Sequence, residues 1–297
     1  ENMAYLSQDQ KDQFWKDGYL MVEDVVDDNL LNAMRSDFAD WVTESRTHSE
    51  SYGTIVDGRS RFDLEPGHNA DVPALRRVNA PVEVSDAYYA AMFDSRMTAC
   101  VADLIGPNVK FHHSKINSKL PGGQTEVKWH QDFPFTPHSN DDLVTALLMI
   151  DEVTEENGPL EVLPGSHKGD IHGLWHNGVF TGAVAEDVAK ESQSKAVTCV
   201  GKAGSVCLMH TQLLHGSTSN LSAQPRTLFI CVYSAEDEIP CSPNPVPTKF
   251  QGLLVKGERT NKVRSMDFQI ELPQLPTTAS FFDQQAYDEV GDGHAKR

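Results

Sequence analysis

The feature that most restricts the fold of this 297-residue chain is a series of short apolar runs that begins near residue 108. These runs are rich in β-branched and aromatic residues, which favour strands. They occupy residues 109–120, 125–135, 143–153, 160–166, 195–201, 205–211 and 226–235. Turn-forming stretches such as "PGG", "ENGP", "KAGS" and "SAQP" interrupt the series. The pattern predicts an antiparallel double-sheet barrel.

The residues before this series are predicted to be mostly helical. Apolar residues at spacings of three and four indicate helices over 7–17, 28–44 and 84–106, the first with Ser7 as its N-cap. A short strand is expected over 19–26, and the Gly-, Asp- and Pro-rich stretch 51–75 is expected to be a loop. We therefore expect one mostly β domain over 1–297, with a helical part (1–107) packed outside a β core (108–235) and a C-terminal extension or lid (236–297).

Composition narrows the possible partners and the compartment. The formal net charge of −18 disfavours nucleic acid and anionic membranes as partners. The five cysteines are scattered and include no C-x-x-C pair, and the first residues do not form a secretory signal. These observations favour a cytoplasmic protein, while the oligomeric state stays open.

Histidine and carboxylate side chains alternate in the stretch "KWHQDF". If this stretch is a strand, His130 and Asp132 lie on the same face, because side chains two residues apart point the same way. One imidazole and one carboxylate provide two of the three protein ligands of a non-haem iron centre. The pair alone is a weak signal, since polar surface residues often show this spacing.

A third ligand and an anion site are predicted in "LMHTQLLHGSTSNLSAQPR". His210 and His215 both lie there, and Arg226 opens the next strand eleven residues after His215. An arginine across a hairpin from a metal-binding histidine can hold a carboxylate by a bidentate fork. Ser217 shares the strand parity of His215, so the arrangement suits a dicarboxylate cosubstrate. This context favours His215 over His210 as the ligand.

Several stretches together resemble the phytanoyl-CoA dioxygenase family, which comprises Fe(II)- and 2-oxoglutarate-dependent oxygenases and includes ectoine hydroxylase. The similar stretches are "LSQDQKDQFWKDGYLMVEDVV", "FHHSKINSKLPGG", "WHQDF", "ENGPLEVLPGSHKG" and "LLHGSTSN" with the following "PR". The resemblance covers most of the chain. It implies a double-stranded β-helix, or jelly roll, and a requirement for Fe(II), 2-oxoglutarate and O2. It also implies hydroxylation of an unactivated C–H bond, with release of succinate and CO2.

The resemblance also assigns roles to individual residues. It makes His130, Asp132 and His215 the iron ligands, and it places the far carboxylate of 2-oxoglutarate on Arg226 and Ser217. Further expected contacts of the cosubstrate site are Asn117, Lys115 on the same strand face, and Gln131 behind the ligands. The carboxylate of Asp132 argues against a halogenase, in which a small residue replaces this ligand.

The substrate site is less well defined by the sequence. Phe133 and Phe135 are candidates for substrate contacts, although core packing is the default for such aromatics. His138 and His167 lie in turn-like contexts and are expected at the surface, with His138 a candidate for the pocket mouth. The segment 249–264 is a local excess of basic residues, and Arg259 and Arg264 are candidates to attract an anionic substrate to the mouth.

Three alternatives stay open at this point. The same cofactors could act on a natural-product intermediate or an acyl thioester, with hydroxylation, desaturation, ring closure or epimerisation as the outcome. A cupin-like isomerase or hydrolase could use the same three ligands with another metal and would not need Arg226. A jelly-roll binding protein would need no iron. A small polar or anionic metabolite is the substrate class we expect.

Overall fold

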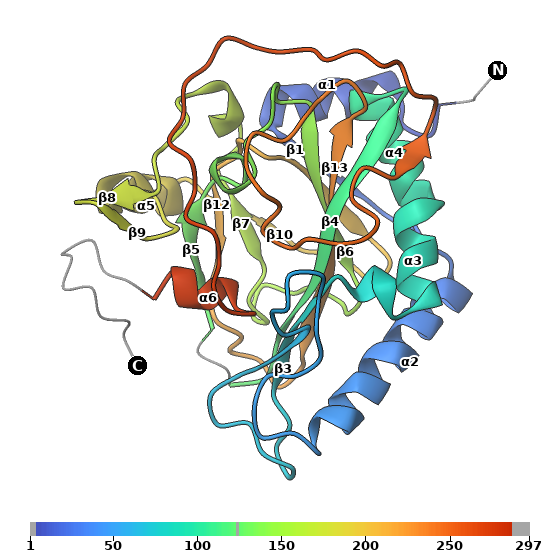
Figure 1. Ribbon diagram of the computed structural model, residues 1–297, viewed down its shortest axis with the longest axis vertical. Coiled ribbons are helices and arrows are strands. Elements are labelled where there is room, and N and C mark those ends of the chain that lie inside the picture. Colours follow the sequence, from blue (N-terminus) through green and yellow to red (C-terminus); the bar gives the residue numbers. More distant parts are fainter. Residues whose placement is uncertain (1–3, 123–124, 287–297) are drawn as a thin grey trace.

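Two antiparallel sheets form the centre of the computed structural model, which describes residues 4–122 and 125–286. The large sheet has the strand order β1-β11-β6-β13-β4-β3-β2, and β14 also pairs with β4. The small sheet has the order β10-β7-β12-β5. This arrangement confirms the predicted jelly roll (Figure 1). The strands of the large sheet are β1 Tyr19–Val22, β11 Val206–His210, β6 Leu143–Met149, β13 Arg226–Ala235, β4 Val109–Lys119, β3 Leu75–Asn79, β2 Phe62–Leu64 and β14 Leu254–Lys256.

The remaining elements surround these strands. The small sheet consists of β10 Val197–Cys199, β7 Leu160–Val162, β12 His215–Ser217 and β5 Val127–His130, and β8 Trp175–His176 pairs with β9 Val179–Phe180. The helices are α1 Gln8–Asp17, α2 Asp28–Ser45, α3 Asp86–Phe93, α4 Arg96–Ile105, α5 Glu186–Ser194 and α6 Phe281–Gln284. Helices α2, α3 and α4 cover the side of the large sheet away from the small sheet (Figure 1). No helix among residues 4–122 and 125–286 is long and apolar enough to span a membrane.

Helix α1 begins and ends where the sequence predicts. The Ser7 hydroxyl accepts a hydrogen bond from the Gln10 amide at 3.2 Å, and the Gln10 side chain accepts one from the Ser7 amide at 2.9 Å. Gly18 follows the helix at φ 84°, where its amide donates to Phe14 O at 2.7 Å. A Cβ at Gly18 would lie 2.5 Å from the His167 ring, so both the backbone angle and the packing require glycine.

The predicted helix over 84–106 is in fact two helices. Helix α3 ends at Phe93 and α4 starts at Arg96. At the break, the Ser95 hydroxyl donates to Ala91 O at 2.7 Å, and Thr98 Oγ1 accepts from the Ser95 amide at 3.2 Å. The Ser95 hydroxyl thus bonds a carbonyl in the last turn of α3, and Thr98 bonds the backbone amide that precedes α4. The apolar periodicity continued across this break and concealed it.

The N-terminal part contributes strands as well as helices. Strand β1 pairs with β11 along one edge of the large sheet, while β3 pairs with β4 and extends the sheet to β2. Strand β2 lies inside the stretch 51–75 that was expected to be a loop. Residues 1–107 are therefore not packed wholly outside the β core, because their strands complete its large sheet.

The C-terminal arm, residues 265–286, runs from the region of β14 around the edge of the molecule to α6, which lies beside β5 (Figure 1). Its last part is fixed by hydrogen bonds to segments far away in the sequence. Arg59 donates to Thr278 O at 3.1 Å and Asn79 donates to Ala279 O at 3.0 Å. Gln285 donates to Gly182 O at 2.7 Å and accepts from the Lys128 amide at 3.0 Å. These bonds hold α6 against the open side of the barrel.

Candidate metal centre

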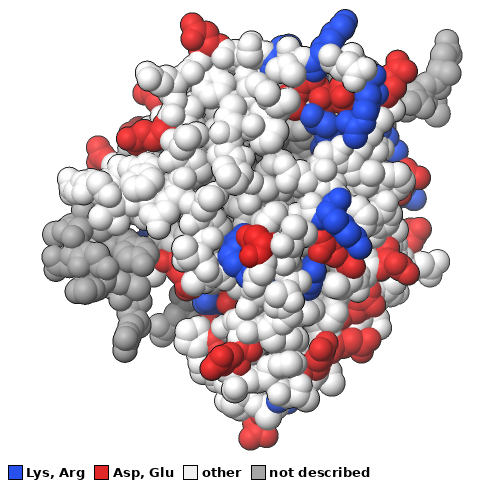
Figure 2. Space-filling view, viewed as in Figure 1, with Lys and Arg blue, Asp and Glu red and all other residues white. Residues whose placement is uncertain are grey.

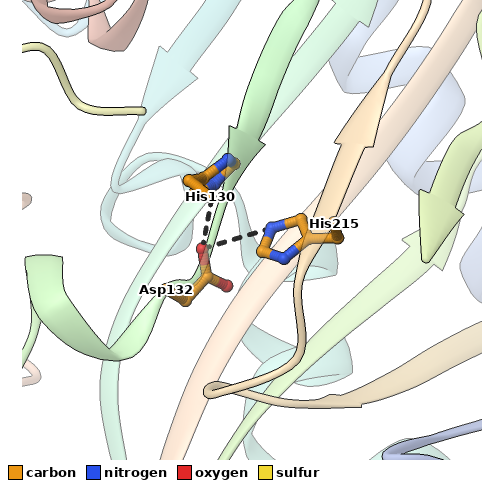
Figure 3. Close-up of side chains that lie close together, drawn as sticks. All are labelled: His130, Asp132 and His215. Carbon is orange, nitrogen blue, oxygen red and sulfur yellow. Dashed lines mark ion pairs between the residues drawn. The ribbon is translucent and has the colours of Figure 1, made fainter. Parts of the chain in front are cut away.

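His130, Asp132 and His215 come together between the sheets. His130 ends β5, and it lies opposite His215, the first residue of the neighbouring β12. Asp132 does not continue the strand, contrary to the sequence expectation. It has φ −73° and ψ −33° and precedes the short 3-10 helix Phe133–Phe135, in which Pro134 supplies the first turn. This turn, rather than strand alternation, brings the carboxylate beside the imidazoles (Figure 3).

The three side chains converge on one point. Asp132 Oδ1 lies 3.4 Å from His130 Nε2 and 3.5 Å from His215 Nε2 (Figure 3). One ligand atom from each residue lies within 4.8 Å of the others. Among the residues that the structure describes, this is the one group of at least three His, Cys, Asp or Glu side chains close enough to share a metal ion. Two imidazoles and one carboxylate are the donor set of a non-haem Fe(II) centre with open positions.

Hydrogen bonds behind the ligands fix their orientation. His130 Nδ1 donates to Lys128 O at 2.7 Å, and His215 Nδ1 donates to Leu213 O at 2.9 Å. Each bond leaves a lone pair on Nε2, the atom that faces Asp132. The other oxygen of Asp132 accepts from Thr145 Oγ1 at 2.7 Å. The chain thus presents three free donor atoms in a fixed arrangement, which fits a divalent metal ion.

The local electrostatics favour the protonation states that a metal requires. Burial, and then the neighbouring His215 ring, lower the pKa of His130. Burial alone would raise the pKa of Asp132, but the two imidazoles hold it well below its ordinary value. At neutral pH the pair therefore provides a neutral imidazole and a carboxylate, so a metal ion need not displace protons from them.

A pocket extends from these residues toward Arg226. We call it the cosubstrate compartment; its lining includes Asn117, Ser217, Arg226 and Leu228. Arg226 is buried, and its Nε donates to Gly158 O at 3.0 Å. Arg226 belongs to β13 of the large sheet, whereas His215 belongs to β12 of the small sheet. The expected hairpin between them is wrong, because the connection crosses from one sheet to the other and the residues face each other across the barrel.

Lys119 lies behind Ser217 at this end of the pocket, a position that the sequence did not indicate. Its ammonium group donates to Ser217 Oγ at 2.7 Å and also bonds Thr218 O. Burial, and then the nearby Arg226, lower the pKa of Lys119 to about 6. The available signal was strand parity, because Lys119 follows Lys115 and Asn117 on the same face of β4. The far end of the compartment therefore combines two basic side chains with a hydroxyl.

Phe135, Phe133 and Gln131 lie in three different surroundings near the candidate ligands. Phe135 lies against the His130 ring, with centroids 5.6 Å apart, and lines the pocket on the other side of Asp132. Phe133 is fully buried and packs on Phe268, with centroids 5.4 Å apart, so it is a core residue. Gln131 donates to Gln212 O at 2.6 Å and accepts from the His172 amide at 2.8 Å. Gln131 thus ties together the loops behind the ligands.

His138, His167 and His210 are buried, so the expected surface positions of the first two are wrong. His138 is 1 % exposed and its Nδ1 donates to Thr136 O at 2.7 Å. His167 is 7 % exposed and its ring packs against His210, with centroids 5.1 Å apart. His210 ends β11 and lies near Phe14 and Trp15, away from the three ligands. Aromatic neighbours from distant segments cover these turns.

The basic segment 249–264 lies outside the pocket. Arg264 pairs with Asp237 at 3.0 Å and also with Asp142, and Arg259 donates to Gly252 O at 2.8 Å. Lys256 pairs with Asp94 at 2.9 Å. On the face shown in Figure 2, Lys and Arg side chains lie interleaved with Asp and Glu. Neither Arg259 nor Arg264 lines a pocket at the three ligands among the described residues.

Comparison with known proteins identifies the family of the chain. The phytanoyl-CoA dioxygenase (PhyH) family model matches residues 14–228. The chain belongs to the phytanoyl-CoA dioxygenase family. A probable alpha-ketoglutarate-dependent hypophosphite dioxygenase from Stutzerimonas stutzeri is 31% identical over 225 residues, which are 74% of this chain and 78% of the relative. An ectoine dioxygenase from Bordetella parapertussis is 27% identical over 77% of this chain and 76% of its own length.

Solved structures agree on the fold of this phytanoyl-CoA dioxygenase family member. EctD from S. alaskensis with bound Fe has a TM-score of 0.65 and 22% identity, covering 92% of this chain and 90% of that chain. The expected enzyme class and cofactors are confirmed: the protein is an Fe(II)- and 2-oxoglutarate-dependent dioxygenase. The arrangement of His130, Asp132 and His215 suits that cofactor set.

Proposed function

We propose that the protein hydroxylates an unactivated C–H bond of a small polar metabolite at a centre formed by His130, Asp132 and His215. The observation that supports this most is the convergence of three oriented donor atoms at one end of a pocket whose other end holds a buried arginine. The relatives named above act, by name, on hypophosphite and ectoine, and a third is an L-proline trans-4-hydroxylase from Streptomyces griseoviridis, 26% identical. All three are small polar molecules.

In this proposal the cosubstrate compartment binds 2-oxoglutarate between the metal and Arg226. The guanidinium of Arg226 and the hydroxyl of Ser217 bond the far carboxylate, and the amine of Lys119 holds the Ser217 hydroxyl in place through its hydrogen bond. Asn117 lies between the two ends, and its buried amide oxygen lacks a hydrogen-bond partner among the described residues. That unpaired group supports a polar ligand at this position.

The chain's own residues position the reactants and exclude water. When bound, the iron and 2-oxoglutarate supply the oxidation, in which one oxygen atom of O2 enters the substrate C–H bond and the other enters succinate, with loss of CO2. Thr145 holds the Asp132 carboxylate, and the backbone carbonyls of Lys128 and Leu213 hold the imidazoles. Phe135 and Phe281 flank the His130 ring, with centroids 5.6 and 5.5 Å away, and shield this side from water.

A succinate-release assay tests the proposal. The full chain is supplied with Fe(II), 2-oxoglutarate and O2, and is screened against amino acids, phosphonates, quaternary amines and acyl thioesters. We expect one class to stimulate succinate release and to gain one oxygen atom in the mass spectrum. A product with no added oxygen would instead show desaturation or ring closure, and stimulation by acyl thioesters alone would contradict a small polar substrate.

The Arg226→Ala variant tests the assignment of the cosubstrate compartment. Loss of a charged hydrogen-bonding partner should raise the KM for 2-oxoglutarate roughly tenfold to hundredfold. Arg35→Ala is the matched control, because Arg35 also donates from Nε to a backbone carbonyl, Ile150 O, at 3.0 Å but lies outside the pocket. Turnover that is unaffected in Arg226→Ala and independent of 2-oxoglutarate would favour a metal-dependent isomerase or hydrolase.

A further inference from the structure

A second compartment lies on the opposite side of Asp132 from Arg226. Its lining includes Arg77, His113, Phe135, Val246 and Thr278, and we call it the substrate compartment. Lys115, Asp132, Thr145 and Phe281 line both compartments. Along β4, Asn117 lies toward Arg226 and His113 lies toward the second compartment, with Lys115 between them. The two compartments therefore adjoin at Asp132 and Lys115, while His130 and His215 line only the compartment of Arg226.

Arg77 is a buried cation with spare hydrogen-bonding capacity. It lies on β3 opposite Asn117 of β4, and only 5 % of its surface is exposed. Its Nε donates to Asn79 Oδ1 at 2.8 Å, while Nη1 is buried and has no hydrogen-bond partner within residues 4–122 and 125–286. Asp63, a nearby carboxylate, instead pairs with Arg76 at 2.8 Å. A buried guanidinium nitrogen without a partner carries a large desolvation penalty, which an anionic ligand would remove.

Lys115 adds a second positive charge beside Arg77. Its ammonium lies 5.7 Å from the centre of the Phe281 ring. Burial, and then the repulsion from Arg77, lower the pKa of Lys115 to about 8. Within the described part of the chain, neither Arg77 nor Lys115 has a carboxylate within 4.0 Å. Two unpaired cations in one enclosed space are unusual in a chain whose formal net charge is −18.

The other polar groups of the chamber do not balance this charge. Arg59 is already occupied, because it pairs with Asp57 at 2.8 Å and donates to Pro245 O and Thr278 O. His113 shares a hydrogen bond with His112, and burial lowers its pKa well below the ordinary value, which leaves it neutral. Asp132 is the one carboxylate in the lining, and it faces the other two ligands. A substrate that supplies negative charge would complete this chamber.

We propose that Arg77, assisted by Lys115, binds an oxyanion of the substrate, so that the substrate is a small phosphonate, phosphinate or carboxylate. This inference rests on the proposed hydroxylase function and adds a substrate class to it. The guanidinium fork of Arg77 bonds the oxyanion in the substrate compartment, and the remainder of the molecule then extends toward the metal ligands. The anion site thus lies on β3 and β4 inside the barrel rather than on the basic segment 249–264.

Calorimetry on the full chain tests the proposal, with Fe(II) and 2-oxoglutarate present and O2 excluded. The probes are methylphosphonate, methylphosphinate and acetate, with acetamide as the uncharged comparison. We expect at least one anion to bind and acetamide not to bind. Arg77→Gln should weaken anion binding at least tenfold, and Arg77→Lys should restore part of the loss. Arg264→Gln is the matched control, because it removes the same charge at a site outside the pocket and should bind as wild type.

The outcomes separate this inference from the proposed function. If 2-oxoglutarate binds and is consumed with Fe(II), yet no anion binds or Arg77→Gln binds as tightly as wild type, the anion site is overturned while the hydroxylase stands. If Arg77→Gln weakens 2-oxoglutarate instead of the probe, Arg77 serves the cosubstrate and the inference is equally overturned. If 2-oxoglutarate is not consumed in the separate aerobic succinate-release assay with Fe(II), the proposed function fails first. Thermal unfolding of each variant identifies a folding defect. If Arg77→Gln has such a defect, anion binding by Arg77→Lys is compared with wild type instead.

Discussion

Individual hydrogen bonds set the geometry of the three candidate ligands before any metal binds. Each imidazole donates from Nδ1 to the carbonyl two residues earlier in its own chain, Lys128 O for His130 and Leu213 O for His215. Asp132 lies outside the strand and relies on Thr145, a residue of β6 in the opposite sheet. The carboxylate therefore depends on a tertiary contact, whereas the imidazoles depend on local ones.

Replacing Thr145 tests this dependence. Thr145→Val removes the 2.7 Å bond to Asp132 Oδ2 and keeps the shape of the side chain. Loss of such a bond behind a metal ligand should weaken Fe(II) binding roughly tenfold to hundredfold. Anaerobic titration with Fe(II) measures the change. Thr227→Val, which removes a buried hydroxyl bond to Ser118 instead, is the control and should keep wild-type affinity. Equal affinities in both variants would contradict the role given to Thr145.

A buried carboxyl far from the ligands makes stability depend on pH. Glu238 is fully buried, and neither of its oxygens has a hydrogen-bond partner among the described residues. Burial, and then Asp142, raise its pKa to about 9. The unfolded chain has a value of about 4.3, so between these limits the folded state keeps a proton that the unfolded state releases. This group should lower the free energy of unfolding by up to about 1.4 kcal/mol per pH unit as pH rises.

Glu238→Gln should therefore be as stable as wild type near pH 4 and increasingly more stable toward pH 9. Chemical denaturation at several pH values measures the difference between the two proteins. Glu258→Gln, at an exposed position, should follow the wild-type pH profile. A constant difference between Glu238→Gln and wild type across this pH range would show that Glu238 titrates normally.

The sequence identifies site residues that lie in a recognisable local motif. It does not identify residues that reach the site only through long-range strand pairing. His130, Asp132, His215 and Arg226 lie in short stretches with informative neighbours. Arg77 lies in no such motif, and its neighbour Arg76 has the same charge. Only the pairing of β3 with β4 shows that Arg77 belongs to a buried site, whereas Arg76 pairs with Asp63. The segment of Arg259 and Arg264 does contain an excess of basic residues. In the structure, however, Arg264 pairs with an acidic side chain and Arg259 bonds a backbone carbonyl.

At the scale of elements, the sequence predicts which segments are strands and which are helices, but it does not predict where they end or which strands pair. The run 125–135 was predicted as one strand, yet β5 stops at His130 because the chain turns into the 3-10 helix at Phe133. The residue type at Pro134 signals such an end, but the flanking aromatics Phe133 and Phe135 conceal it. Sheet membership is set by long-range pairing, so the sequence could not show that β12 and β13 lie in different sheets.

The attachment of α6 to β5 is testable through one side chain. Gln285 bonds both Gly182 O and the Lys128 amide, so Gln285→Ala should loosen the end of the C-terminal arm. We expect amide hydrogen exchange over residues 276–286 to rise roughly tenfold and the KM for 2-oxoglutarate to increase. Gln269→Ala, an exposed position on the same arm, should change neither. Unchanged exchange in Gln285→Ala would show that the other contacts suffice to hold the arm.

For the molecule as a whole, the jelly roll and its flanking helices followed from the sequence, and β1 lies within the strand predicted over 19–26. Strands β2 and β3, and the pairing of all three strands with the large sheet, did not follow from it. Strands β1, β2 and β3 are short, from three to five residues each. The apolar residues of β2 and β3 also fit the loop pattern around them, whereas β1 lies in a segment recognised as a strand. Packing against β11 and β4 decides their conformation, and such non-local pairing is not visible in periodicity.

Metal binding should stabilise the whole fold. Because the ligands come from both sides of the β5–β12 pair, a divalent ion at about 100 times its Kd should add about 2.7 kcal/mol. For a chain of this size that corresponds to a rise of roughly 4 °C in Tm. His215→Ala should abolish the rise measured by thermal unfolding. His210→Ala should lower the starting Tm but keep the rise, and the reverse behaviour would make His210 the ligand.

The position of Phe281 has a consequence for substitutions in the C-terminal arm. Phe281 and its neighbours in the C-terminal arm wall the substrate compartment, yet they lie beyond residues 14–228, which carry the family's shared pattern. The wall of the substrate compartment thus comes partly from a segment outside the stretch that matches the family. Phe281 also lies 5.5 Å from the His130 ring and lines the compartment of Arg226, so a substitution in the arm should affect the binding of substrate and of 2-oxoglutarate together.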